Sequence, residues 1–189
     1  MDILVDAWSE RLPLFTDRLS LVAIAADDIA TLAELGNAFE IAKNTSRVPH
    51  PLTSESVAAW LQAQGRSERA LKICRRDDGH ILGIVSLAGL ETGRGELGYW
   101  LGRDHWGNGL ATEAAQAIID FGFDGLDLGE IEAACRVTNP ASRRVIEKCG
   151  FQPRGHGLMH SVAVGGTVAI ERYALDRKTW CSLKKWARS

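Results

Sequence analysis

The chain has 189 residues, of which 46% are hydrophobic and 24% are charged, and its formal net charge at pH 7 is -2. This length and composition favour one globular domain and argue against a disordered chain. The small negative charge creates no field that would recruit nucleic acid, so we expect no nucleic-acid partner.

The cysteines and the N-terminus point to a reducing compartment. Four cysteines lie far apart without a Cys-x-x-Cys pair, namely Cys74, Cys135, Cys149 and Cys181. This spacing disfavours a zinc site and a disulfide scaffold, so we expect reduced thiols and no metal. The first six residues carry acids where a signal peptide needs basic residues, and no apolar run reaches membrane-spanning length. We therefore predict a cytoplasmic protein with no membrane partner.

The first third of the chain predicts a strand and two helices. Residues 18–24 alternate as a strand, and Asp27 is placed to cap a helix that ends near Gly36. A polar connector with two prolines follows over residues 42–51. Thr53 is expected to cap the second helix, on which Trp60 shares a face with apolar neighbours, so we favour core packing over a cleft position for Trp60.

The middle of the chain predicts an antiparallel meander. Residues 71–75, 80–88 and 96–101 alternate as strands, and tight turns with glycine join them. The pattern then changes to strand, helix, strand, helix, which requires a parallel crossover. With a last strand at 168–175, we predict an α+β domain with a mixed, mostly antiparallel sheet flanked by helices.

A loop with two glycines, Gly107 and Gly109, joins the third meander strand to a helix. The apolar residues of that helix recur at helical spacing from Ala115 to Phe123. The first N–H groups of a helix have no intrahelical acceptor, and the peptide dipoles add positive charge there. The loop is therefore suited to hold a phosphate or pyrophosphate.

Two common phosphate-binding motifs do not fit this loop. A P-loop requires Gly-Lys-Ser/Thr, but no lysine follows Gly109. A dinucleotide fingerprint requires Gly or Ala at position 112, which is Thr112, and an acid after the next strand, where the chain has Thr138-Asn139-Pro140. An enzyme that uses ATP or NAD is therefore disfavoured.

Two blocks resemble the GCN5-related N-acetyltransferase (GNAT) superfamily. Residues 106–114 resemble its motif A, in which Gly109 and Ala111 match while Trp106 departs from the usual first residue. Residues 139–151, which open Asn-Pro-Ala-Ser and close Gly-Phe, resemble its motif B. The wording of both blocks is similar to the branch that includes the ribosomal-protein alanine and serine N-acetyltransferases.

Residues 15–21 resemble the first strand of the same branch, so the resemblance covers residues 15–175. We take this range as the predicted domain, with residues 1–14 as an extension and 176–189 as a basic tail. Trp180, Leu183 and Trp186 recur in the tail at helical spacing, which favours docking on the domain or on a second subunit, as in a homodimer, over binding of nucleic acid.

The resemblance implies the acyl-CoA N-acyltransferase fold, with a splayed parallel strand pair at the cofactor site and acetyl-CoA as the donor. A backbone N–H near residues 99–101 would polarise the thioester carbonyl. The implied cofactor-binding residues are Tyr99, Trp100, Leu101, Trp106, Gly107, Asn108, Gly109, Leu110, Ala111, Thr112, Asn139 and Ser142.

The resemblance also implies proton-transfer groups. The tyrosine that many members use as the acid is absent, because Ile146 stands there, and Ser142 becomes the implied acid of the ribosomal branch. The alternative is that residues 139–142 only cap a helix. Glu96 is the leading base, directly or through a water, although it could be a solvated hairpin-end charge. His160 is the alternative base.

In the family, the connector at residues 42–51 forms one wall of the acceptor cleft. Asn44, Arg47 and His50 are therefore candidate substrate-binding residues, with a plain surface link as the alternative. The implied acceptor is a primary amine, either a protein N-terminus or a small molecule. A non-catalytic acyl-CoA-binding or regulatory module of the same fold remains the rival interpretation.

Overall fold

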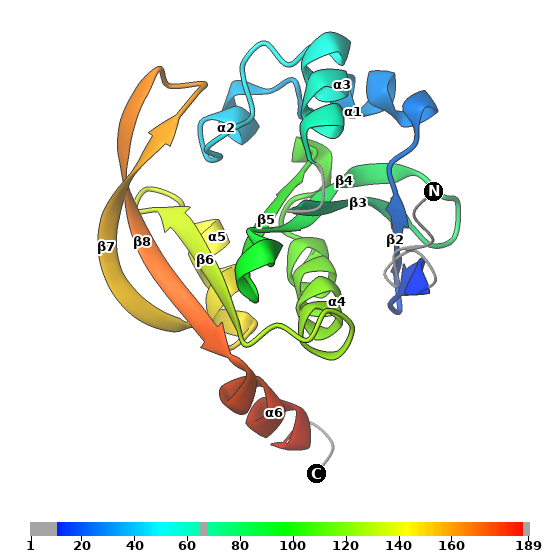
Figure 1. The fold of residues 1–189 in the computed structure, drawn as a ribbon. Helices are drawn as coiled ribbons and strands as arrows, with labels where there is room; N and C mark the ends of the chain where they lie inside the picture. Colours follow the sequence, from blue (N-terminus) through cyan, green and yellow to red (C-terminus); the bar gives the residue numbers. More distant parts are fainter. Residues whose placement is uncertain (1–10, 65–67, 187–189) are drawn as a thin grey trace.

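The computed structural model describes residues 11–64 and 68–186, which form a mixed eight-stranded sheet with helices on its faces (Figure 1). The strand order is β1-β2-β3-β4-β5-β6-β8-β7. Only the β5–β6 pair is parallel among these described strands. The strands are β1 Leu14–Phe15, β2 Leu19–Ala23, β3 Glu68–Arg75, β4 Ile81–Ala88, β5 Arg94–Leu101, β6 Glu130–Arg136, β7 Gln152–Ser161 and β8 Gly166–Asp176.

The helices divide between the two faces of the sheet (Figure 1). The N-terminal helices α1 and α3 pack on one face, and α4 and α5 pack on the other. The helices are α1 Ile29–Gly36, α2 Phe39–Ala42, α3 Ser54–Ala63, α4 Leu110–Asp124, α5 Pro140–Lys148 and α6 Arg177–Trp186, with 3-10 turns η2 Ala26–Asp28, η3 Leu90–Thr92 and η4 Arg103–His105.

The layers enclose two hydrophobic clusters. The larger cluster lies under α4, where the predicted apolar stripe, including Ile118 and Phe123, is fully buried. The smaller cluster lies between α1, α3 and the opposite face of the sheet, and it contains Leu32, Val57 and Ile84. Burial of apolar area on both faces stabilises the sheet, because each buried side chain of this size contributes about 1.5–3 kcal/mol.

The predicted meander and parallel crossover are confirmed, since β3, β4 and β5 pair antiparallel and β5 pairs with β6 in parallel. The cap predicted at Thr53 is also confirmed, because its Oγ1 accepts the Ser56 N–H at 3.2 Å. The cap predicted at Asp27 is wrong. Asp28 faces inward instead, and its Oδ2 accepts from the Ala25 N–H at 2.7 Å and from Lys72 Nζ at 2.6 Å.

Strand β7 was not predicted. It contains Pro153, Gly155 and Gly157, most of its side chains are exposed, and its register with β8 shifts between Pro153 and Gly155. A strand with so little burial shows no alternation of apolar and polar residues, which is the signal by which strands are predicted.

The C-terminal helix α6 docks on the domain through Trp180. The indole of Trp180 stacks on the Phe123 ring at 5.1 Å between centroids, and its Nε1 donates to Asp120 Oδ1 at 2.8 Å. Lys184 pairs with the same carboxylate. The predicted docking on the domain is therefore confirmed for Trp180, whereas Trp186 is 86% exposed and does not pack on the domain, so docking on a second subunit stays a prediction. No helix within the described residues is long and apolar enough to span a bilayer.

Candidate functional site

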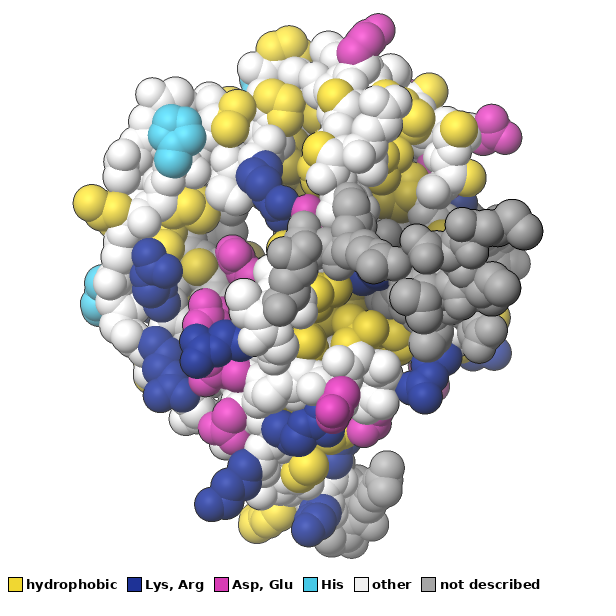
Figure 2. Space-filling view, in the orientation of Figure 1, with side chains coloured by type: hydrophobic (Ala, Val, Ile, Leu, Met, Phe, Trp, Pro, Cys, Tyr) yellow, Lys and Arg dark blue, Asp and Glu magenta, His cyan; other side chains and the backbone are white. Residues whose placement is uncertain are grey.

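The two parallel strands part in the middle of the sheet. Their pairing runs from Arg94 with Glu130 to Leu97 with Ala133. Beyond Leu97, β5 pairs with β4 alone as far as Leu101. A cleft of about 310 Å³ opens here, lined by the connector after α2, by α3, and by residues of β3, β4, β5, β6, α5 and β7. The space-filling view shows the surface hollowed between the β7–β8 side and the α2–α3 side (Figure 2).

The glycine loop lies at the N-terminus of α4, as predicted. Gly107 and Gly109 have φ of 78° and 76°, in the left-handed region that strains other residues. A Cβ added at Gly107 would meet nothing within 4 Å, so the backbone is open there. Trp106 Nε1 donates to the Leu101 carbonyl at 2.8 Å and ties the loop to the end of β5. This open backbone at the start of a long helix fits a pyrophosphate.

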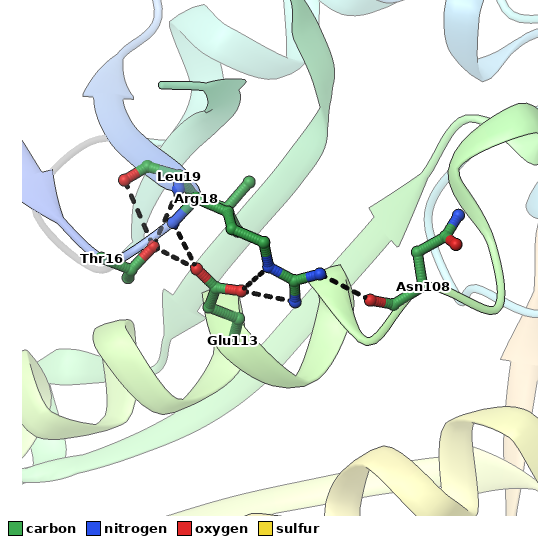
Figure 3. A network of polar contacts seen from close by, with 5 residues as sticks. All are labelled: Thr16, Arg18, Leu19, Asn108 and Glu113. Atoms are coloured by element: carbon green, nitrogen blue, oxygen red, sulfur yellow. Dashed lines mark hydrogen bonds and ion pairs between the residues drawn. The ribbon is translucent and has the colours of Figure 1, made fainter. Parts of the chain in front are cut away.

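A carboxylate on α4 braces this loop from behind (Figure 3). Glu113 Oε1 accepts from Thr16 Oγ1 at 2.6 Å and from the Arg18 N–H at 2.9 Å. Glu113 Oε2 accepts from Arg18 Nε at 2.7 Å and pairs with Arg18 Nη2 at 2.6 Å. The guanidinium also donates from Nη1 to the Asn108 carbonyl in the loop at 3.0 Å. The start of β2, the loop and α4 are thus held together.

Burial alone would raise the pKa of Glu113, but the hydrogen bonds from Thr16 and Arg18 and the charge of Arg18 together lower it. The carboxylate is therefore ionised at neutral pH, and the pair with Arg18 is intact. The brace was not predicted, although Thr16 and Arg18 lie in the stretch 15–21 that resembles the first strand of the family branch.

The predicted acid, Ser142, meets a tyrosine hydroxyl. Tyr99 Oη lies 2.7 Å from Ser142 Oγ and 3.3 Å from the Ser142 carbonyl, to which it can also donate. Both residues line the cleft. Burial raises the pKa of the Tyr99 phenol, so it stays protonated at neutral pH. Tyr99 was predicted among the cofactor-binding residues, but no role was predicted for its hydroxyl, which is an additional polar group at this site.

The helix-cap alternative for Asn139 is confirmed, because its Oδ1 accepts the Ser142 N–H at 3.2 Å. The cap fixes the start of α5 and with it the position of Ser142. The cofactor role of Asn139 stays a prediction. The position of the absent family tyrosine, Ile146, is 1% exposed and belongs to the core.

Of the two predicted bases, the structure brings one to the cleft. Glu96 is exposed on β5, lines the cleft and has no hydrogen-bond or ion-pair partner within the described residues. His160 is exposed on β7 and does not line the cleft, whereas its neighbour Met159 does. Successive side chains of a strand point to opposite faces, so His160 points away when Met159 points in.

Two of the three predicted acceptor residues line the cleft. Arg47 forms a bidentate pair with Glu68, at 2.7 Å from Nη1 to Oε2 and 3.0 Å from Nη2 to Oε1. Asn44 donates from Nδ2 to the Glu40 carbonyl at 2.9 Å. His50 is outside the lining, and its ring lies 5.7 Å from that of Phe39. The involvement of Glu68 was not predicted, because residue 68 lies 21 positions from its partner.

Two tryptophans, Trp60 and Trp100, both pack in a hydrophobic cluster and line the cleft. Trp60 packs against the smaller hydrophobic cluster, as predicted, but it also lines the cleft, which was the disfavoured option. Trp100 likewise packs on this cluster and faces the cleft. Leu101 is buried in the larger cluster, on which Leu110 and Ala111 also pack. The described residues contain no group of three or more His, Cys, Asp or Glu that could hold a metal ion.

Known proteins resemble this chain over most of its length. The sequence profile described as "Acetyltransferase (GNAT) domain" matches residues 18–152. An N-acetyltransferase of Bacillus licheniformis named p20 is 29% identical over 174 residues, which cover 88% of this chain and 97% of that protein. The ribosomal-protein-serine acetyltransferase of Escherichia coli is 26% identical over 149 residues, which cover 72% of this chain and 80% of that protein.

A solved structure also shares the fold. The spermidine N-acetyltransferase of Vibrio cholerae, in complex with CoA and spermine, superposes with a TM-score of 0.76 at 20% identity. The match covers 88% of this chain and 99% of that protein.

Proposed function

This chain belongs to the GNAT family of acetyltransferases, and we propose that it transfers an acetyl group from acetyl-CoA to a primary amine bound in the cleft between β5 and β6. The observation that carries the proposal is the junction of two features. An open glycine loop at the N-terminus of α4 adjoins the point where the parallel strands part, and that point opens into a cleft containing Glu96 and Ser142.

The donor would bind across this junction. Backbone N–H groups of residues 107–112 would hold its pyrophosphate, because the helix N-terminus offers unpaired donors and positive dipole charge. The β5 backbone at residues 98–101, which is not paired with β6, would contact the pantetheine arm. Acetyl-CoA supplies the acetyl group as a thioester, whose C–S bond breaks as the C–N bond to the amine forms.

Glu96 is the group of this cleft best suited to receive the proton of the amine. The amine must lose a proton before it can attack the thioester, and a carboxylate beside an ammonium holds it by charge and can accept a hydrogen bond from a relaying water. Glu96 would therefore hold the ammonium and pass its proton through a water to solvent. Its lack of a partner among the described residues leaves both carboxylate oxygens free for this role.

Ser142 would donate its hydroxyl proton to the departing sulfur and take up a proton from solvent in its place. When the Tyr99 phenol donates to Ser142 Oγ, the hydroxyl proton of Ser142 is free to point into the cleft. The raised pKa of Tyr99 keeps its proton available as a hydrogen-bond donor at neutral pH. Tyr99 acts here through Ser142 and is a positioning residue, while the cap at Asn139 fixes the helix that carries the serine.

The names of similar proteins leave two classes of acceptor as candidates. One relative is named a ribosomal-protein-serine acetyltransferase, and one similar structure is a spermidine N-acetyltransferase bound to spermine. A protein N-terminus and a small amine are therefore both candidates for this chain.

Calorimetric titration with acetyl-CoA, CoA, NAD and ATP tests the donor, and thiol release with an amine panel tests transfer. We expect saturable binding of acetyl-CoA and CoA only, and turnover that falls in Glu96→Gln and Ser142→Ala while acetyl-CoA affinity holds. Binding of the coenzymes without turnover on any amine would support the rival acyl-CoA-binding module. No binding of either coenzyme would rule out the proposed function.

A further inference from the structure

We infer that the acceptor of this enzyme is an amine with a single positive charge and an apolar body, rather than a polyamine. This inference rests on the proposed function and concerns the same cleft. It depends on two properties of the cleft, namely the apolar character of the part under α3 and the pairing of its charged side chains.

The part of the cleft under α3, its apolar end, is formed by residues of the smaller hydrophobic cluster. Leu52, Val57 and Ile84 are each less than 10% exposed and present the remaining surface to the cleft. The indoles of Trp60 and Trp100 add large, half-buried faces beside them. An alkyl or aromatic body placed here removes apolar surface from water on both partners, which favours binding.

The charged side chains described in the cleft leave one carboxylate that can pair with a cation. Three charged residues are among its described lining, namely Arg47, Glu68 and Glu96. Both oxygens of Glu68 are taken by the guanidinium of Arg47, at 2.7 and 3.0 Å. Glu96 alone is without a partner in the described part of the chain. An amine that reacts at this site therefore finds one free carboxylate.

A second ammonium on the same acceptor would find no free counter-ion among the described residues that line the cleft. In the apolar end it would lose its hydration without a new partner and would lie near the cation of Arg47, both of which oppose binding. The adjoining groove over β6 and β8 shares Glu96 with the cleft, and its other described carboxylates, Glu130 and Glu132, both lie near arginines. There, Arg94 lies 3.7 Å from both Glu130 and Glu132, and Arg154 lies 3.6 Å from Glu130.

Hexylamine and cadaverine test this inference directly, because they have the same length and differ only in a terminal methyl or ammonium group. With acetyl-CoA saturating, we expect kcat/KM per amino group to be greater for hexylamine by about tenfold or more. Equal or better use of cadaverine would overturn the inference. That result differs from a failure of the proposed function, in which calorimetry on the same preparation would show no acetyl-CoA binding, and the inference would fall with it.

Arg47→Gln sharpens the test, because it frees the carboxylate of Glu68 to receive a second ammonium. We expect the ratio of cadaverine to hexylamine activity to rise by about tenfold in this variant. Arg75→Gln is the matched control, since Arg75 forms a 2.8 Å pair with Asp78 at a turn outside the cleft. An unchanged ratio in a folded Arg47→Gln protein with normal acetyl-CoA affinity would overturn the role given to the Arg47–Glu68 pair. The wild-type ratio decides the acceptor class even if the variant does not fold.

Discussion

Removal of the Glu113 carboxylate charge should loosen the glycine loop at the start of α4 (Figure 3). In Glu113→Gln, the amide oxygen can still accept from Thr16 and the Arg18 N–H, but the amide nitrogen would face the Arg18 guanidinium, donor against donor. A hydrogen bond to a charged group contributes about 1.5–3 kcal/mol to stability. The Arg18 side chain is 53% exposed and that of Glu113 is 17% exposed, so solvent screening reduces this contribution.

We therefore expect Glu113→Gln to lower the free energy of unfolding by about 1–2 kcal/mol, or the melting temperature by about 2–8 °C for a chain of this size. Because Arg18 also holds the Asn108 carbonyl, the KM for acetyl-CoA should rise by about tenfold, while kcat stays within about twofold. Thermal unfolding and steady-state kinetics measure the two effects. Glu34→Gln, at an exposed position on α1, is the control and should change neither.

The stability that Glu113 contributes should depend on pH. The pKa of Glu113 is lowered in the folded state, so its contribution to stability is present above the ordinary value of 4.5 and is lost as the pH falls through the folded value. The stability difference between wild type and Glu113→Gln should therefore close in acid. If the variant melts like the wild type at neutral pH and binds acetyl-CoA equally well, the carboxylate does not brace the loop.

Three further variants probe the acid, the acceptor end and the C-terminal helix. In Tyr99→Phe, Ser142 loses its phenol partner, so kcat should fall by about tenfold with acetyl-CoA affinity unchanged. If Tyr99→Phe lowers kcat by the same factor in a protein that already carries Ser142→Ala, Tyr99 acts independently of the serine. In Gly36→Ala, the new Cβ would lie 2.7 Å from Leu52 Cδ2 and push this lining residue toward the cleft. The KM for the acceptor should therefore rise about threefold or more, while the affinity for acetyl-CoA is unchanged. An unchanged KM for the acceptor would contradict a tightly packed cleft wall. In Trp180→Phe, the indole N–H bond to α4 is lost, which should cost about 1 kcal/mol by chemical denaturation, and wild-type stability would argue against docking through this bond.

Local patterns in the sequence were enough to predict the glycine loop at the start of α4. Left-handed backbone favours glycine, and Gly107 and Gly109 both adopt it, so their spacing before a helix carries information in one short stretch. The apolar stripe of α4 is equally local, because its residues share one face of one helix. The meander was predictable for the same reason, since tight turns fix antiparallel pairing between neighbours in sequence.

Contacts between segments far apart in the sequence could not be predicted from local patterns. Tyr99 and Ser142 are 43 positions apart and meet only because β5 and β6 separate in front of α5. The Glu113 brace joins residues 95 and 97 positions apart. Neither pair follows a spacing rule, because the sheet order sets which side chains become neighbours. The assignment of His160 as a base drew on its residue type and its place in the chain, whereas the alternation of β7 decides which side chains enter the cleft.

The two ends of the cleft rest on different hydrophobic clusters, and this separation has a functional consequence. The donor loop is held by α4 and β2, whose buried residues belong to the larger cluster, while the acceptor end is formed by residues of the smaller cluster under α1 and α3. Strand β5 connects the two, because its residues 96–100 line the cleft and its Leu101 carbonyl accepts from Trp106 Nε1 of the glycine loop at 2.8 Å. Substitutions in the smaller cluster can therefore reshape the acceptor site without moving the loop that would bind acetyl-CoA. If β5 itself were displaced, donor and acceptor affinities should change together, which separates the two classes of variant in one kinetic experiment.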